Sequence, residues 1–119
     1  MKPVNIIEKF SLINDYWNPR IIAELNGQNV KLAKVKGEFV WHDHKDEDEL
    51  FYVVKGQLRI EFRDHTEEVN EGEMLVVKRG EEHRPIAEEE VWIMLFEPME
   101  TKHTGDIRTD YTVDDFERI

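Results

Sequence analysis

Cysteine is absent from this sequence of 119 residues, and its absence excludes several kinds of chemistry. Disulfide bonds, thiolate metal sites and a cysteine nucleophile all require a residue that the chain does not contain. Serine is nearly absent as well, because Ser11 is the only one. No motif typical of a serine nucleophile, a phosphate-binding loop or a dinucleotide-binding turn is present.

Basic residues are also few relative to acidic ones. The chain has 16 Lys and Arg against 27 Asp and Glu, a net charge of −11. Nucleic acids and anionic membranes both require a basic surface, so we expect neither as a partner. No stretch approaches the roughly 20 apolar residues of a membrane-spanning helix, and the first residues lack the apolar run of a signal peptide. We therefore expect a cytoplasmic protein.

Short runs rich in Val, Ile, Leu and aromatic residues are what the chain does have. They recur at a spacing of about ten residues, with turn residues between them, which is typical of an all-β fold. Glycine stands at most of the boundaries, where a turn often needs a positive φ. The runs predict strands at 19–25, 30–35, 39–42, 50–54, 57–63, 67–69, 74–77, 84–87 and 91–97.

The two ends of the chain have a different pattern. Apolar residues in 5–13 have the spacing of a short amphipathic helix. Near the other end, Thr112 precedes Asp115 by three residues, which resembles a capping box and predicts a short helix at 113–119.

The segment 91–96 is apolar at every position, as expected for a strand that is covered on both faces. The second cover could come from the terminal segments or from another subunit. Because exposed sheet faces and edges are commonly protected by pairing, we expect a homodimer.

Two histidines and a glutamate form the first candidate site. His42 and His44 are two residues apart, so on a strand they would project from the same face. Glu49 would open the next strand of a hairpin and could reach the same point. Imidazole and carboxylate together suit Fe, Mn, Ni, Co or Zn. The pair of histidines alone is weak evidence, since two polar residues on a solvated strand face give the same pattern.

A second element strengthens this interpretation. The segment 72–83 supplies a strand, a glycine turn and then His83. The segment 37–56 resembles the first cupin motif, in which a glycine precedes a His-x-His pair, a Glu and another glycine. The segment 72–83 resembles the second cupin motif, in which a glycine is followed by a Pro-x-Gly turn and a His.

Three positions depart from the cupin pattern without removing a ligand. Four residues, and not the usual five, separate Gly37 from His42. Lys78 stands where the turn proline is usual, and Ala87 stands where an Asn is usual.

The resemblance implies a cupin-type double-stranded β-helix, a jelly-roll barrel with short terminal helices. Residues 1–119 would form a single domain, with the core barrel at about 19–97 and a tail at 98–119. One divalent transition metal per chain (Fe, Mn, Ni, Co or Zn) would be bound, with further coordination positions left for water or substrate. The expected ligands are His42, His44, Glu49 and His83, and the expected pocket-lining residues are Phe51, Ile60 and Met94.

Two classes of function remain open. The first is a metalloenzyme, such as a dioxygenase or an isomerase, that acts on a small molecule. The second is a metal-dependent module that binds or senses a small molecule without turnover, and a purely structural metal is a third reading. The remaining histidines, His65 in a predicted turn and His103 in the tail, are interpreted as surface residues.

Overall fold

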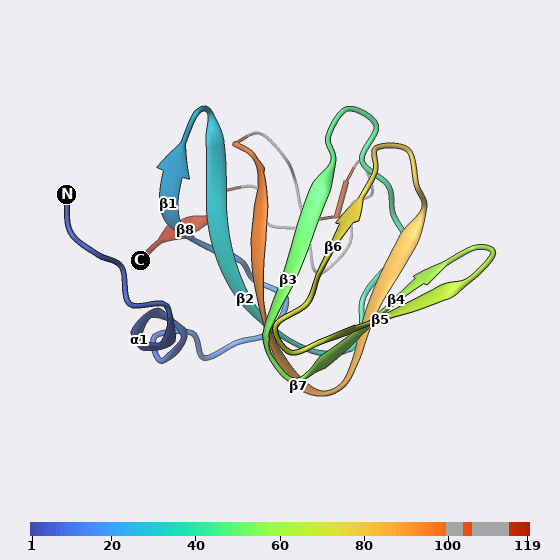
Figure 1. Cartoon of the computed structure of the whole chain (residues 1–119), viewed down its shortest axis with the longest axis horizontal. Coiled ribbons are helices and arrows are strands. Elements are labelled where there is room, and N and C mark those ends of the chain that lie inside the picture. Colours follow the sequence, from blue (N-terminus) through green and yellow to red (C-terminus); the bar gives the residue numbers. More distant parts are fainter. Residues whose placement is uncertain (100–103, 106–114) are drawn as a thin grey trace.

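The structure, a computed structural model, describes residues 1–99, 104–105 and 115–119. This part of the chain contains one short helix and eight strands (Figure 1). The elements are α1 (Ile6–Phe10), β1 (Arg20–Leu25), β2 (Gln28–Glu38), β3 (Glu49–Lys55), β4 (Gln57–Phe62), β5 (Thr66–Asn70), β6 (Met74–Val77), β7 (His83–Pro98) and β8 (Glu117–Arg118). The predicted all-β fold is confirmed.

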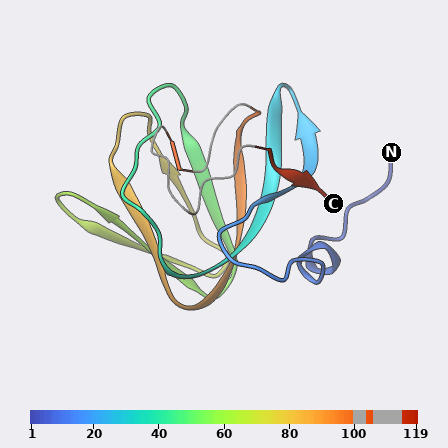
Figure 2. The ribbon, with the colours of Figure 1, turned by 180° about the vertical axis from the view of Figure 1, so that it is seen from behind.

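The sheet is organised around β7, its longest strand. One edge of β7 pairs with β2, and its other edge pairs first with β4 and then with β3. The strand order is β5-β4-β7-β2-β1-β8, and β6 is attached through β3. Because β7 bends back at the bottom of Figure 1, β4 and β5 lie across the interior from β1 and β2, and Figure 2 shows the same arrangement from behind. Within the described residues the result is an open sheet folded on itself.

The course of β7 differs from the strands that the sequence predicted. Two strands were expected at 84–87 and 91–97, but one continuous strand covers both and includes the acidic run 88–90 between them. The residues 88–90 are exposed on that strand. Pairing with β2 continues on both sides of the bend, through a register shift next to Gly37, so the ladder holds the acidic run in the strand.

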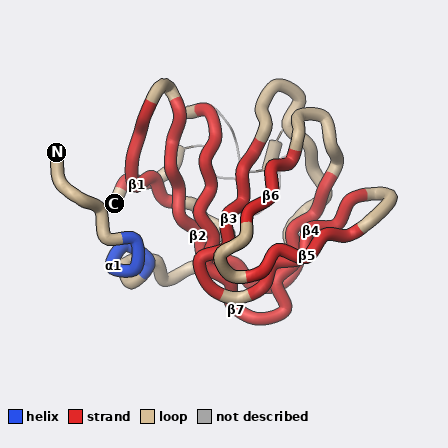
Figure 3. The backbone as a smooth tube through the Cα atoms, in the orientation of Figure 1, coloured by secondary structure: helices blue, strands red, loops and turns tan. Residues whose placement is uncertain are grey.

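Both faces of the second half of β7 are covered, as its apolar run predicted. Ile93 and Leu95 point into the main core, whereas Trp92 and Met94 belong to a second cluster on the outer face. There Phe10 of α1 stacks on Trp92 with ring centroids 4.8 Å apart, and Figure 3 shows α1 outside the sheet. The terminal segments therefore supply this cover, and the homodimer stays a prediction.

The helices predicted at the two ends of the chain have different outcomes. Asn5 caps α1, because its side chain accepts a hydrogen bond from the Glu8 amide at 3.0 Å. The helix expected at 113–119 is wrong for residues 115–119, where β8 pairs in parallel with β1. Strand pairing with β1 prevails over the local capping pattern, and Thr112 lies outside the described residues. No helix in the described part is long and apolar enough to span a membrane.

Gly56, between β3 and β4, yields a stability prediction. Its φ is +95°, and a Cβ there would lie 3.1 Å from the Glu90 carbonyl oxygen. Gly72 has a φ of +83°, but a Cβ there would meet nothing within 4 Å. We expect Gly72→Ala to lower the unfolding free energy by about 1–2 kcal/mol through backbone strain. Gly56→Ala should lower it by roughly a further 1 kcal/mol or more through the clash. Equal effects in urea unfolding would contradict this.

Candidate metal centre

Two of the four predicted ligands are placed by direct backbone pairing. His42 and His83 form an antiparallel bridge, in which each amide donates to the other residue's carbonyl at 3.0 and 2.9 Å. The strand expected at 39–42 is wrong, because β2 ends at Glu38 and only His42 pairs beyond it. Pro85 explains the gap: it accepts a hydrogen bond from the Phe39 amide at 2.9 Å but has no N–H to return.

The other two ligands come from a loop and from the start of a strand. His44 lies in the loop before β3, and its carbonyl accepts a hydrogen bond from the Gly80 amide at 2.8 Å. Glu49 is the first residue of β3 and pairs with Val77 of β6. The turn after β6 therefore holds the loop that carries His44, and His44 reaches the site from irregular backbone and not from a strand.

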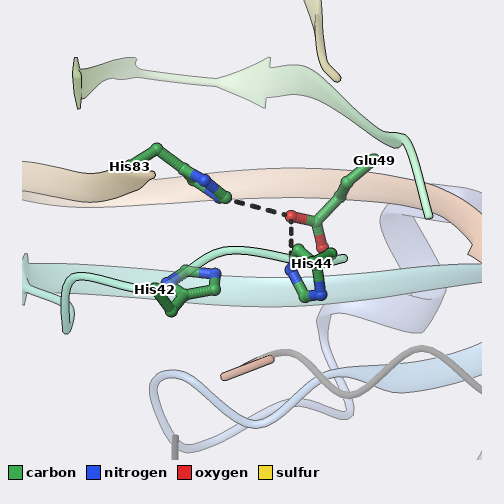
Figure 4. Close-up of side chains that lie close together, drawn as sticks. All are labelled: His42, His44, Glu49 and His83. Carbon is green, nitrogen blue, oxygen red and sulfur yellow. Dashed lines mark ion pairs between the residues drawn. The ribbon is translucent and has the colours of Figure 1, made fainter. Parts of the chain in front are cut away.

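The four side chains converge on one point in the interior (Figure 4). They are all buried, and each offers a ligand atom within 4.8 Å of the others. Glu49 Oε1 lies 3.4 Å from His44 Nε2 and 3.6 Å from His83 Nε2. Three imidazoles and one carboxylate are a donor set that suits a divalent transition metal.

The hydrogen bonds of the rings also fit a metal. His42 Nδ1 lies 2.9 Å from the Val40 carbonyl oxygen, and His83 Nδ1 lies 2.9 Å from the Glu81 carbonyl oxygen. Because a carbonyl only accepts, each Nδ1 must carry the proton, which leaves the lone pair on Nε2. Within the described residues, the Nε2 atoms of all three histidines and Glu49 Oε1 are buried without a hydrogen-bond partner. Such groups are costly unless something binds them.

The electrostatics of the site favour the protonation states that a metal needs at His42 and Glu49, but favour a proton on His44. Burial, assisted by His83, lowers the pKa of His42 to about 3, so this ring is neutral at physiological pH. Burial raises the pKa of Glu49, but the adjoining His44 and His83 outweigh it and hold that pKa well below its usual range. Burial lowers the pKa of His44, but the neighbouring Glu49 carboxylate outweighs it, so the net shift is upward.

The raised pKa of His44 predicts a pH dependence of metal binding. A metal must displace the His44 proton, so Mn²⁺ affinity should fall as the pH is lowered through a value above the ordinary 6.5. For one proton the fall approaches about tenfold per pH unit. Chelator competition between about pH 6 and pH 9 would measure it. His65→Asn, at an exposed turn, should leave the profile unchanged, and a flat wild-type profile would contradict the prediction.

The predicted pocket residues have three different positions. Phe51 lines a cavity that reaches the site beside His42 and Glu49. Ile60 is fully buried in the main core but does not line this cavity. Met94 lies in the outer cluster with Trp92, so the structure places it outside the pocket. The reason is the alternation of β7, which turns Ile93 and Leu95 inward and Met94 outward.

Several residues of the site carried no signal in the sequence analysis. Trp17 and Phe39 stack at 4.6 Å and line the same cavity, with Pro85 beside them. Trp17 comes from the segment before β1, so no strand pattern could place it there.

A buried ion pair next to the site was also missed. Lys31 Nζ lies 2.9 Å from Glu97 Oε1, and both side chains are fully buried. Burial and the adjacent Glu49 carboxylate raise the pKa of Glu97 well above its ordinary value, whereas Lys31 opposes the rise. The alternation of side chains along β2 could have indicated that Lys31 is buried, because Lys31 shares the inward face of this strand with Ala33 and Val35.

The remaining histidines lie elsewhere. His65 is exposed in the turn between β4 and β5, as the sequence predicted. Its ring also contacts the Asp64 carboxylate at 2.7 Å. His103 lies outside the described residues. Trp41, between His42 and the end of β2, does not line the cavity and packs under the Arg63 guanidinium at 3.8 Å.

Comparison with known proteins agrees with this architecture. The family model described as the cupin domain matches residues 29–97. The crystal structure of a cupin-2 domain-containing protein from Shewanella frigidimarina is 53% identical, with a TM-score of 0.79 over 80% of this chain and 93% of that one. The crystal structure of protein NMB1881 from Neisseria meningitidis is 32% identical, with a TM-score of 0.76 over 82% of this chain and 99% of that one.

A relative from Bacillus subtilis, the uncharacterized protein YdbB, is 42% identical over 64 residues. The match spans 53% of this chain and 57% of that relative's length. The family match covers more than half of the residues, and it includes both histidine-bearing segments and Glu49. The chain belongs to the cupin family.

Proposed function

We propose that this protein is a metal-dependent enzyme that acts on a small molecule, with one divalent transition metal held by His42, His44, Glu49 and His83. One observation carries the proposal. Four buried ligand atoms, none with a hydrogen-bond partner in the described residues, converge beside an interior cavity. A site built only for stability would not need that cavity.

The chain's own residues would do three things. The backbone bridge and the carbonyl partners of the rings fix the lone pairs of His42 and His83 in direction. The Glu49 carboxylate, charged at neutral pH, supplies negative charge to the site. Trp17, Phe39 and Phe51 form part of the apolar wall of the cavity. When bound, the metal would supply Lewis acidity or, for iron or manganese, redox chemistry.

One observation favours a second candidate, a binding module without turnover. Among the described residues that line the cavity, the only ionisable side chains are His42 and Glu49, which are themselves expected ligands. No separate general acid or base is therefore placed there, and a binding module needs none.

A metabolite experiment separates the two candidates. Wild-type protein loaded with Fe²⁺ or Mn²⁺ would be incubated with a filtered small-molecule extract, which is then analysed by mass spectrometry. An enzyme should deplete one compound in molar excess over protein and form a product, whereas Glu49→Gln and metal-free protein should not. Retention of a compound at one per chain without product would favour the binding module. No depletion and no retention would contradict both.

A further inference from the structure

We infer that the ligand of this site is a small molecule with a short apolar body and an oxygen-bearing head. The inference rests on the proposed function, because the head is expected at the metal. It concerns the cavity beside His42 and Glu49, and it excludes sugars, polyols and phosphate esters as the main ligand class.

The chemistry of the cavity wall is the first support. Beyond His42 and Glu49, every described lining residue is apolar or aromatic: Trp17, Pro19, Ala33, Val35, Phe39, Phe51, Pro85, Ile93 and Leu95. The one polar group among their side chains is the indole N–H of Trp17, and it donates to the Lys36 carbonyl at 2.8 Å. A hydroxyl group on the body of a ligand would therefore lose its water without gaining a described side-chain partner.

Charge is the second support. None of the described lining residues is Lys or Arg, so the wall offers no cation to a phosphate. Lys31, a fully buried cation of the interior, is paired with Glu97 at 2.9 Å. Polar contacts are thus concentrated at the metal end of the cavity, beside His42 and Glu49.

The size of the cavity is the third support. Its volume is about 30 Å³, which is room for about two water molecules. A ligand that places its oxygen atoms at the metal thus has space for an apolar body of only a few carbon atoms. The side chains that limit this space, such as Val35 and Leu95, come from the centre of the sheet and are 1% and 3% exposed.

Two isosteric hydroxy acids test the inference. 2-Hydroxybutyrate and glycerate share the same α-hydroxycarboxylate head and differ only in a terminal methyl against a terminal hydroxyl. The protein would be loaded with Co²⁺, whose visible spectrum reports a change of its ligands, and titrated with each acid. We expect 2-hydroxybutyrate to bind about 10- to 100-fold more tightly, because an apolar wall discriminates against an added hydroxyl to about this extent.

A matched pair of variants locates the preference. Val35→Thr keeps the shape of a lining residue and adds a hydroxyl, so it should reduce the ratio of the two dissociation constants severalfold. Val53→Thr makes the same change at an equally buried core position that does not line the cavity. It should leave the ratio unchanged even if it destabilises the fold as much.

The outcomes distinguish a wrong ligand class from a wrong metal site. If Co²⁺ binds and glycerate binds as tightly as 2-hydroxybutyrate, the ligand class is overturned and the metal site stands. If Co²⁺ binds and neither acid changes the spectrum, the ligand class is likewise overturned. If the wild-type chain does not bind Co²⁺ near neutral pH, the proposed function fails, and this inference fails with it.

Discussion

Elemental analysis of the wild-type protein should find close to one transition-metal ion per chain, and His42→Ala or Glu49→Ala should reduce it to near zero. Each substitution removes one of the four donors that converge within the described part of the chain. The metal would then have to bind to an incomplete set of three ligand side chains. The metal should stabilise the wild-type fold as well, by about 4 kcal/mol at a free concentration near one thousand times the dissociation constant. This stabilisation should disappear in both variants.

Sample preparation and a control variant determine whether the measured metal belongs to this site. The protein would be prepared untagged, without chelators or nickel resin, because affinity among first-row metals follows chemistry as much as biological use. His65→Ala removes an exposed histidine and should keep the full metal content. A wild-type chain that takes up no metal after reconstitution at about pH 7.5 would contradict the metal site.

Lys31→Met should lower the unfolding free energy of the metal-free protein by about 3–5 kcal/mol. The substitution leaves the Glu97 carboxylate fully buried without its lysine partner and next to a second carboxylate, Glu49. Burial and Glu49 already raise the pKa of Glu97 while Lys31 opposes the rise, so removing the lysine should raise that pKa further. Urea unfolding, followed by tryptophan fluorescence, would measure the loss.

Two further variants make this result specific. Lys31→Met combined with Glu97→Leu removes both charges and should recover much of the lost stability, since a buried pair can be replaced by apolar residues at little net cost. Lys78→Met removes an exposed lysine 3.8 Å from Asp48 and should change stability by no measurable amount. A Lys31→Met protein as stable as Lys78→Met would show that the buried pair is not needed for the fold.

Much of this architecture follows from local rules. The strands were predictable because alternating apolar residues and glycine turns act over a few residues. Six of the nine expected runs each correspond to a separate strand, two more lie together in β7, and only the run 39–42 does not form a strand. The four candidate ligands were recognised from spacing and from the resemblance to cupin motifs, and the structure brings them together. That they hold a metal stays a prediction, to be settled by the metal analysis.

Details of the same site escaped the sequence because they depend on pairing between distant segments. His44 was expected on a strand, yet it reaches the site from a loop held by Gly80. Met94 was expected in the pocket, yet the register of β7 turns it toward α1. At the C-terminus, a pattern typical of a helix start gave way to pairing of β8 with β1.

By itself, the sequence determined the all-β class and the absence of thiol chemistry, because composition and periodicity are local properties. Its resemblance to the cupin motifs supplied the four candidate ligands. Only the tertiary structure decided what surrounds those ligands. Trp17 lines the cavity from outside the sheet, and Lys31 of β2 pairs with Glu97 of the neighbouring strand β7. Such contacts join residues far apart in the chain, and they form only when strand register and burial have been settled for the fold as a whole.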